Sequence, residues 1–132
     1  MEPLHTDASR RLDPRRSVGA TGEEAAARHL ASLGYRVLGR NVKAGGVEVD
    51  IVALAPDGAA AVVEVKSRTG PWHPEDRVDA LKRERMVRAA SVLSGSGPLA
   101  DRLFQFDVVA VEVRADGSAI VTHWPRAFDS PH

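Results

Sequence analysis

Polar and apolar residues alternate along two stretches of the chain, residues 46–54 and 61–68, which flank the turn sequence Pro56-Asp57-Gly58. Because the side chains of a strand point alternately to opposite faces, each stretch predicts a strand with one charged face. The charged positions are Glu48 and Asp50 in the first strand and Glu64, Lys66 and Arg68 in the second. The candidate chemistry of the chain is therefore expected on two adjacent strands.

The register of this hairpin decides whether the two charged faces meet. A three-residue loop with Gly58 in the left-handed conformation places Asp50 opposite Glu64, and by the same register Glu48 opposite Lys66. A two-residue loop would shift the strands by one residue and mix charged with apolar faces. We favour the three-residue loop because it gathers five apolar side chains on one side of the hairpin. These are Val47, Val49, Ile51, Val63 and Val65.

Apolar residues recur at helical spacing over residues 21–33, which predicts a first helix. Thr21 followed by Glu24 has the spacing of a capping box, and Gly34 is the expected stop. Glu23 lies on the stripe that is expected to be buried. The other members of this stripe are Ala26, Ala27, Leu30 and Leu33. A carboxylate there is explained either by the helix dipole or by a role in a site, and the helix alone leaves both explanations open.

A second helix is expected at about residues 79–93, with Asp79 as its N-cap and glycines 95 and 97 beyond its end. Its core stripe comprises Met86, Ala89, Ala90 and Leu93. Lys82 continues this stripe one turn toward the N-terminus. The stem of Lys82 is therefore expected to pack beside the core.

Three further strands follow from the remaining apolar runs. They are a short strand at residues 35–41, a long covered strand at 104–113 and a last strand at 118–124, which Pro125 ends. The last strand is expected at an edge of the sheet. The order helix, three strands, helix, two strands indicates an α/β fold in which helices flank a central mixed β-sheet.

Length and composition fit one globular domain of 132 residues, with 43% hydrophobic and 27% charged residues. The expected boundaries are a mobile N-terminal arm at residues 1–17 and a single domain at residues 18–128. The arginines of the arm either contact phosphates or are merely solvated. No apolar run could span a bilayer, and the N-terminus lacks the apolar core of a signal peptide. The default expectation is a cytoplasmic location without membrane contact.

Charge and cysteine usage narrow the classes of function. The chain has no cysteine, which excludes disulfides, thiolate metal sites and cysteine nucleophiles. Eighteen basic residues balance eighteen acidic ones, so nucleic-acid binding would need a local patch. Residues 66–88 carry seven basic and four acidic residues, and Arg68 and Arg85 are the candidate phosphate contacts in this excess. In the loop after Arg68, Trp72 and His73 either stack on a ligand or fix the loop to the body of the domain.

The charged faces of the hairpin gather three carboxylates, those of Glu48, Asp50 and Glu64, beside Lys66. Like charges directly opposite destabilise a sheet, and a divalent cation between them removes the conflict. Magnesium and manganese prefer oxygen ligands, so Asp50, Glu64 and the carbonyl of Val65 form a credible partial shell. Lys66 could hold or deprotonate a water and stabilise a phosphate, which points to phosphodiester hydrolysis. The alternative is an exposed hairpin whose charges contact only water, and the apolar flanking strands favour the metal site.

Several motifs follow one another between residues 19 and 111. They are Gly19-x-x-Gly22-Glu23-x-x-Ala26, Leu33-Gly34-Tyr35 through Arg40-Asn41, Glu48-Val49-Asp50-Ile51-Val52, Val63-Glu64-Val65-Lys66-Ser67-Arg68, Lys82 and Phe106-Asp107-Val108. In these motifs the chain resembles the YraN family. This family of small bacterial proteins is assigned to the PD-(D/E)xK, restriction-endonuclease-like superfamily, which is similar to Holliday-junction resolvases.

The resemblance implies that Asp50 and Glu64 bind the metal and that Lys66 is the catalytic lysine. It also implies that Glu23 approaches from the first helix, as a helix glutamate does in related resolvases. Glu48 belongs to the Gly-Glu-hydrophobic-Asp pattern of the family, but its glycine is displaced here by one position. The resemblance further gives Lys82 a phosphate contact, beside the alternative of a stem packed on the core.

Taken together, the sequence and its resemblance predict a restriction-endonuclease-like fold and a magnesium- or manganese-dependent nuclease. The expected substrate is DNA, in branched or single-stranded forms. The expected metal-binding residues are Asp50, Glu64, Val65, Glu23 and Glu48. A homodimer is expected by analogy with resolvases alone. Two alternatives stay open: a noncatalytic nucleic-acid or protein-binding module on the same fold, and a purely structural adaptor.

Overall fold

A six-stranded sheet with the order β1-β6-β5-β4-β3-β2 organises the molecule. The computed structural model describes residues 17–71 and 79–129, together with the backbone of residues 4–8. The strands are β1 (Leu4–Ala8), β2 (Arg36–Ala44), β3 (Val47–Leu54), β4 (Ala60–Thr69), β5 (Phe104–Val113) and β6 (Ala119–Phe128), and the helices are α1 (Val18–Ser32) and α2 (Ala80–Gly95). From α1 onward this is the predicted order of elements, and the predicted α/β fold with a mixed sheet is confirmed. Within the described residues, no helix is long and apolar enough to cross a membrane.

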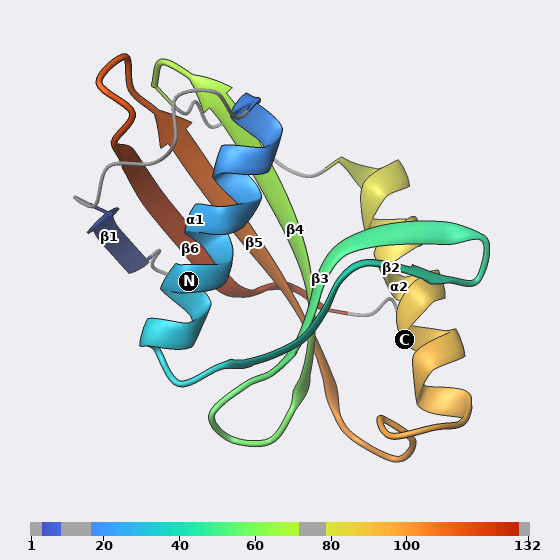
Figure 1. The fold of residues 1–132 in the computed structure, drawn as a ribbon. Helices are drawn as coiled ribbons and strands as arrows, with labels where there is room; N and C mark the ends of the chain where they lie inside the picture. The colour runs from blue at the N-terminus through green and yellow to red at the C-terminus, as the bar shows by residue number, and fades with distance from the viewer. Residues whose placement is uncertain (1–3, 9–16, 72–78, 130–132) are drawn as a thin grey trace.

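The two helices cover opposite faces of the sheet (Figure 1). Three consecutive alanines of α1, residues 25–27, and Leu30 pack in one core with inward-facing residues such as Val63 and Val109. Met86 of α2 packs in the other core with residues such as Val62 and Phe106. Strands β4 and β5 run parallel because α2 carries the chain back across the sheet between them, whereas all other strand pairs are antiparallel.

Helix α1 begins three residues before the predicted start. Its N-cap is Ser17, whose hydroxyl accepts a hydrogen bond from the Ala20 N–H at 3.1 Å. Thr21, predicted as the cap, is buried within the helix instead. The helix ends as predicted before Gly34, which has φ +91°. Leu33 is the C-cap and is 37% exposed, so the predicted end of the buried stripe is wrong, and His29 is buried in its place.

The predicted register of the β3–β4 hairpin is confirmed where the two strands pair. Ile51 lies opposite Val63 and Leu54 opposite Ala60, and Gly58 has φ +91° in the loop. The pairing stops there, because β3 leaves β4 and continues with β2 alone. Three parts of the prediction are therefore wrong. Glu48 pairs with Lys43 of β2 instead of lying opposite Lys66, and Val47 and Val49 pack in the α2 core instead of joining Ile51.

Helix α2 and strand β5 confirm their predictions most closely. Asp79 caps α2 by accepting a hydrogen bond from the Lys82 N–H at 2.9 Å, and the helix ends at Gly95. Strand β5 covers the predicted residues 104–113 and lies between β4 and β6, buried along most of its length.

Strand β6 is longer than predicted and is not an edge along its first half. Pro125 does not end it, because the strand continues to Phe128 past a register shift opposite Asp107. Residues 119–123 pair with β1, a strand that the sequence pattern did not predict. The rest of the predicted N-terminal arm, with its four arginines, lies outside the described residues, as do Trp72 and His73.

Candidate functional site

A bend in the β2–β3 hairpin creates the candidate site. Asn41 has φ +52°, the left-handed conformation, and by the register of β2 and β3 it lies opposite Asp50. Beyond this point the hairpin departs from the plane of the sheet and extends over α2 (Figure 1). The departure opens a gap between β3 and β4 at the place where the predicted carboxylates stand.

Asp50 and Glu64 lie together in this gap. The Asp50 Oδ2 accepts a hydrogen bond from the backbone N–H of Val65 at 2.8 Å, in place of the missing strand ladder. Glu64 is only 5% exposed, and its Oε2 lies 3.0 Å from the Nζ of Lys82 on α2. The stem of Lys82 therefore leads from the face of α2 to a buried carboxylate.

Electrostatics couple the acids of the site. Burial, the charge of Asp50 and a hydrogen bond between the two carboxyl groups raise the pKa of Glu64 to about 7, against the opposing effect of Lys82. Partial burial raises the pKa of Glu23 as well, and Asp50 and Glu48 add to this rise while Arg40 opposes it. The first turn of α1 thus lies within electrostatic reach of the Asp50–Glu64 pair.

The predicted metal-binding residues are gathered only in part. Asp50 and Glu64 are adjacent, and Val65 contributes its N–H to the pair. Glu23 lies nearby, whereas Glu48 is exposed on the departing hairpin. Among the described residues, no group of three or more His, Cys, Asp or Glu side chains has an arrangement that could hold a metal ion. The two-carboxylate core of the prediction is thus assembled, and the three-carboxylate set is not.

The predicted basic residues reach the site from two elements. Lys66 and Arg68 follow Glu64 along β4 and are half-buried. Lys66 makes no ion pair with any described residue, so its amino group is available. Lys82 and Arg85 project from α2, and neither Arg85 nor Arg88, which are both exposed on this helix, forms an ion pair within the described residues.

A pocket of about 390 Å³ lies between the departing hairpin and α2. Its lining comprises Gly46, Val47, Glu48 and Val49 of the hairpin, Glu64 of β4, and Lys82, Arg85, Met86 and Arg88 of α2. Sequence reasoning did not assign Arg88 to the site. The spacing of Lys82, Arg85 and Arg88, three residues apart on one helix, was the signal that could have found it.

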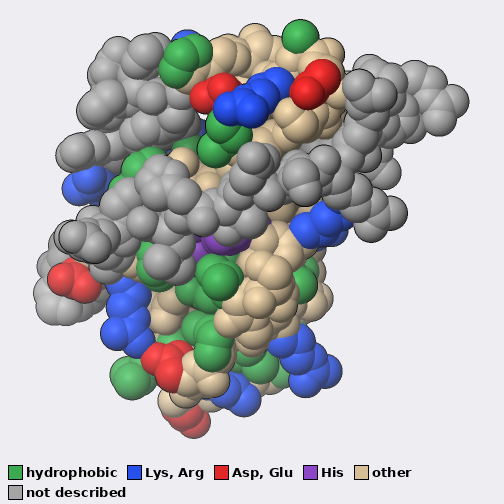
Figure 2. Space-filling model, turned by 90° about the vertical axis from the view of Figure 1, so that its left-hand side faces the viewer, with side chains coloured by type: hydrophobic (Ala, Val, Ile, Leu, Met, Phe, Trp, Pro, Cys, Tyr) green, Lys and Arg blue, Asp and Glu red, His purple; other side chains and the backbone are tan. Residues whose placement is uncertain are grey.

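Basic side chains are scattered on the opposite side of the molecule. On the face drawn in Figure 2, Lys and Arg side chains lie at several separate places among acidic and apolar ones. The row of three basic side chains on α2 belongs to the side that is on the right in Figure 1. Of the local basic excess predicted from the sequence, Lys82, Arg85 and Arg88 line the same pocket as Glu64.

A buried polar network centred on Asp107 was not predicted. Asp107 is fully buried and accepts hydrogen bonds from the Tyr35 hydroxyl at 2.7 Å, the Gln105 amide at 2.9 Å and the Arg126 backbone N–H at 3.1 Å. His123 Nε2 lies 2.8 Å from the same carboxylate. Burial alone would raise the pKa of Asp107, but these hydrogen bonds outweigh it and lower the pKa. The network holds β5, β6 and the start of β2 together.

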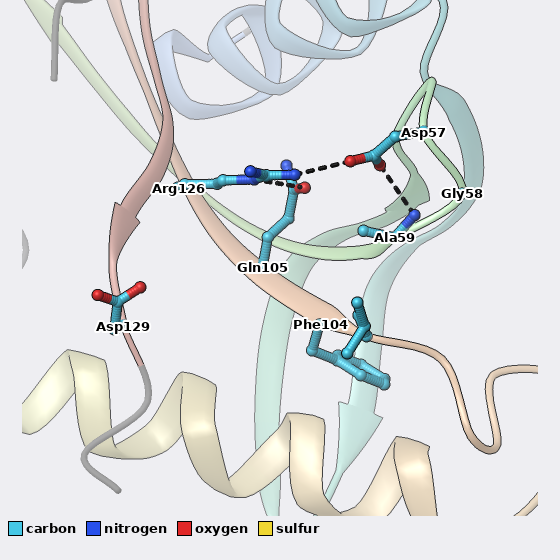
Figure 3. A pocket seen from close by; sticks show the side chains of 8 residues that line it. Asp57, Gly58, Ala59, Phe104, Gln105, Arg126 and Asp129 are labelled. Atoms are coloured by element: carbon cyan, nitrogen blue, oxygen red, sulfur yellow. Dashed lines mark hydrogen bonds and ion pairs between the residues drawn. The ribbon is translucent and has the colours of Figure 1, made fainter.

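A second pocket, of about 420 Å³, lies beside the β3–β4 turn (Figure 3). There the Arg126 guanidinium lies 2.7 Å from an Asp57 carboxylate oxygen and 3.4 Å from the Gln105 side-chain oxygen. The ion pair is exposed on both sides, so it is worth about 0–1 kcal/mol. Figure 3 shows the guanidinium aimed at Asp57, with Asp129 standing apart from both. No predicted site residue lies in this pocket.

Fold and site together define an α/β protein with a carboxylate pair at the point where two central strands separate. Residues 22–111 match the family described as "Uncharacterised protein family UPF0102", and the chain belongs to this family. A UPF0102 protein of Anaeromyxobacter dehalogenans is 44% identical over 121 residues, covering 89% of this chain and 87% of the relative. A UPF0102 protein of Myxococcus xanthus is 41% identical over 118 residues, covering 88% and 92%. One of Trichlorobacter lovleyi is 36% identical over 115 residues, covering 86% and 91%.

Proposed function

We propose that this protein is a magnesium- or manganese-dependent nuclease of the restriction-endonuclease-like class, which hydrolyses phosphodiester bonds of DNA. The observation that carries the proposal is the Asp50–Glu64 pair. The carboxylate of Glu64 is almost fully buried, and its burial together with the charge of Asp50 raises its pKa. Such a pair is costly as a structural device, and a divalent cation turns the repulsion into binding.

The protein offers only part of the oxygen ligands that a hard cation needs. Asp50 and Glu64 are the residues that would hold it, with the Val65 carbonyl as a third ligand, and the remaining positions would be filled by water, as magnesium commonly allows. When bound, the ion would supply Lewis acidity and neutralise charge on the phosphate. Glu23 lies close enough to interact electrostatically with Asp50, which favours an auxiliary role for it at the site.

The roles of the basic residues follow from their positions. Lys66 stands two residues beyond Glu64 on the same face of β4 and is free to donate to a phosphate oxygen or to take a proton from the attacking water. Lys82 balances the charge of Glu64 in the absence of a cation. A bound cation would neutralise Glu64 in its place and would leave the amino group of Lys82 to contact the substrate.

Cleavage of labelled DNA tests the proposal. Linear duplex, nicked, flap, four-way and single-stranded DNA are incubated with Mg²⁺ or Mn²⁺. We expect cleavage to fall by at least about 10²-fold in Asp50→Asn and Lys66→Ala, since each removes a group that acts in the transition state. Arg114→Ala, which removes an exposed charge just after the end of β5, is the control. Activity that persists in both site variants as in the control would overturn the assignment.

A noncatalytic nucleic-acid-binding module is the second candidate. It is favoured by the Lys82–Glu64 ion pair, which already neutralises the buried carboxylate, and by the lack of a three-acid cluster among the described residues. Calorimetric titration with Mn²⁺ separates the two candidates. A nuclease site binds the ion in the wild type and loses it in Asp50→Asn, whereas a binding module takes up no ion in either protein.

A further inference from the structure

The pocket between the β2–β3 hairpin and α2 has the features of a nucleotide subsite. One wall is cationic, because Lys82, Arg85 and Arg88 line it from successive turns of α2. The floor is apolar, since Val49 and Met86 are each 2% exposed and both line the pocket. Glu48 adds a carboxylate on the opposite wall. The cationic wall suits a phosphate, the apolar floor suits the face of a base, and the carboxylate suits an amino group on the edge of a base.

The turn of the hairpin lies against α2 beside the pocket. The turn of the β2–β3 hairpin contacts α2 so closely that a Cβ added at Gly45 would lie 3.0 Å from the Val92 side chain and 3.1 Å from that of Arg88. Gly45 has φ +63°, so a residue with a side chain is disfavoured there on backbone grounds also. The hairpin therefore rests on the helix.

The size of the pocket limits what it holds. A volume of about 390 Å³ is at the lower end of the ~300–1,000 Å³ range of small-ligand pockets. A base can enter a pocket between a hairpin and a helix only when it is unpaired and unstacked, because a base inside a duplex is covered by its neighbours. A single cationic wall likewise matches the phosphates of one nucleic-acid strand and not those of two.

We propose that this pocket binds one unpaired nucleotide of a single-stranded nucleic-acid segment and thereby presents the adjoining phosphate to Asp50 and Glu64. The presentation of the phosphate rests on the proposed nuclease function, whereas the binding of the nucleotide does not. Arg85 and Arg88 contact the backbone, Val49 and Met86 contact the base, and Glu48 accepts a hydrogen bond from a base amino group. The substrate class is thus single-stranded segments, including the free ends of flaps.

Binding measured without cleavage tests the proposal. Fluorescence anisotropy in buffer with EDTA compares a single-stranded DNA of about 12 nucleotides, the RNA of the same sequence and the corresponding duplex. We expect the single strands to bind at least about tenfold more tightly than the duplex. Arg85→Ala and Arg88→Ala should each weaken single-strand binding about five- to tenfold and lower the salt slope by about 0.7, as expected for one lost phosphate contact.

The matched control is Arg114→Ala, which removes one exposed arginine elsewhere and should change binding less than twofold. A preference for DNA or for RNA would identify the source of the segment and supports the pocket in either case. Equal binding of single strand and duplex, no binding of either, or equal losses in Arg85→Ala and Arg114→Ala would overturn the proposal. Thermal unfolding verifies that each variant is folded.

The outcome is separable from that of the nuclease proposal. If the expected binding pattern holds while no DNA form is cleaved, the subsite stands and the nuclease proposal fails. If DNA is cleaved with dependence on Asp50 while Arg85→Ala and Arg88→Ala bind normally, the nuclease proposal stands and the subsite fails.

Discussion

His29 shows how a single residue depends on the network around it. Its Nε2 lies 3.1 Å from His123 Nδ1, and His123 Nε2 lies 2.8 Å from Asp107. With Asp107 ionised, His123 donates to it from Nε2 and accepts from His29 through Nδ1, which leaves His29 Nδ1 buried without a partner. Burial, together with the neighbouring His123, lowers the pKa of His29 to about 4.

Acid is therefore expected to weaken the folded state through His29. In the unfolded chain the residue binds a proton below its ordinary pKa of about 6.5, whereas the folded protein excludes it down to about 4. Stability from this residue is complete above pH 6.5 and falls as the pH drops toward 4, by about 2 kcal/mol between pH 7.5 and pH 5. Urea unfolding of the wild type and of His29→Gln at both pH values measures this loss as the difference between the two proteins, because Glu64, whose pKa is raised to about 7, gains stability as the pH falls over the same range.

The control for this prediction is His29→Gln, which keeps a polar side chain but does not titrate. It is expected to be less stable at pH 7.5 and to lose less stability between the two pH values. Identical losses in the wild type and His29→Gln would show that other groups cause the acid sensitivity.

At the scale of elements, the bend at Asn41 positions Asp50. Strands that continued in plane would have extended the β3–β4 ladder past Ile51, and the Val65 N–H would then be part of that ladder. Instead the hairpin leaves the sheet, and the Asp50 side chain accepts the hydrogen bond from Val65. The left-handed conformation of Asn41 lies at the turning point, and asparagine tolerates it better than most residues.

Substitution of Asn41 tests this role. Asn41→Val should cost about 1–2 kcal/mol of stability, because a β-branched residue is strained at positive φ. It should also weaken Mn²⁺ binding by displacing Asp50. Asn41→Gly is the matched control, since glycine adopts this conformation freely and should preserve both properties. Normal Mn²⁺ affinity in Asn41→Val, measured by calorimetry, would disprove the link between the bend and the site.

Gly22 sets the distance between α1 and β4. A Cβ at this position would meet the Oγ and Cβ of Ser67, which is the residue after Lys66. Gly22→Ala is therefore expected to push the helix from the strand at a cost of about 1–3 kcal/mol, as overpacking does in other cores. Removing the opposing side chain in the double variant Gly22→Ala/Ser67→Gly should recover part of this loss. If urea unfolding shows no recovery of stability in the double variant, the contact between residues 22 and 67 is not the cause of the loss.

At the scale of the whole molecule, the two faces of the sheet are expected to have separate tasks. The α1 face adjoins the Asp107 network, which links the C-terminal strands to the start of β2. The α2 face holds the pocket, the carboxylate pair and the row of basic residues. Because the net charge is zero, the nucleic-acid binding proposed above would depend on this local basic row.

Stability should therefore respond to cations through the α2 face alone. If the carboxylate pair binds Mn²⁺, the folded state gains about 2.7 kcal/mol at a concentration of one hundred times the dissociation constant. The melting temperature of the wild type should rise with Mn²⁺, and that of Asp50→Asn should not. Asp57→Asn, at the far turn, should respond like the wild type. An equal rise in all three proteins would indicate nonspecific binding.

Local patterns account for what the sequence determined by itself. The element order, the cap at Asp79, the extent of β5 and the register next to Gly58 depend on residues close in the chain, where alternation, capping and turn chemistry act directly. The adjacency of Asp50 and Glu64 followed from that register. The sequence also showed the basic excess, because the charges of residues 66–88 can be counted without knowledge of the fold.

Only the tertiary structure decided where the hairpin leaves the sheet, which face Val47 and Val49 join, and how Lys82 meets Glu64. It also showed that Asp107, Tyr35 and the two histidines form one buried network, although 94 residues separate His29 from His123. No short-range pattern encodes such contacts, because they depend on strand twist and on pairing between distant segments. A buried carboxylate acquires its partners only when the fold brings them together.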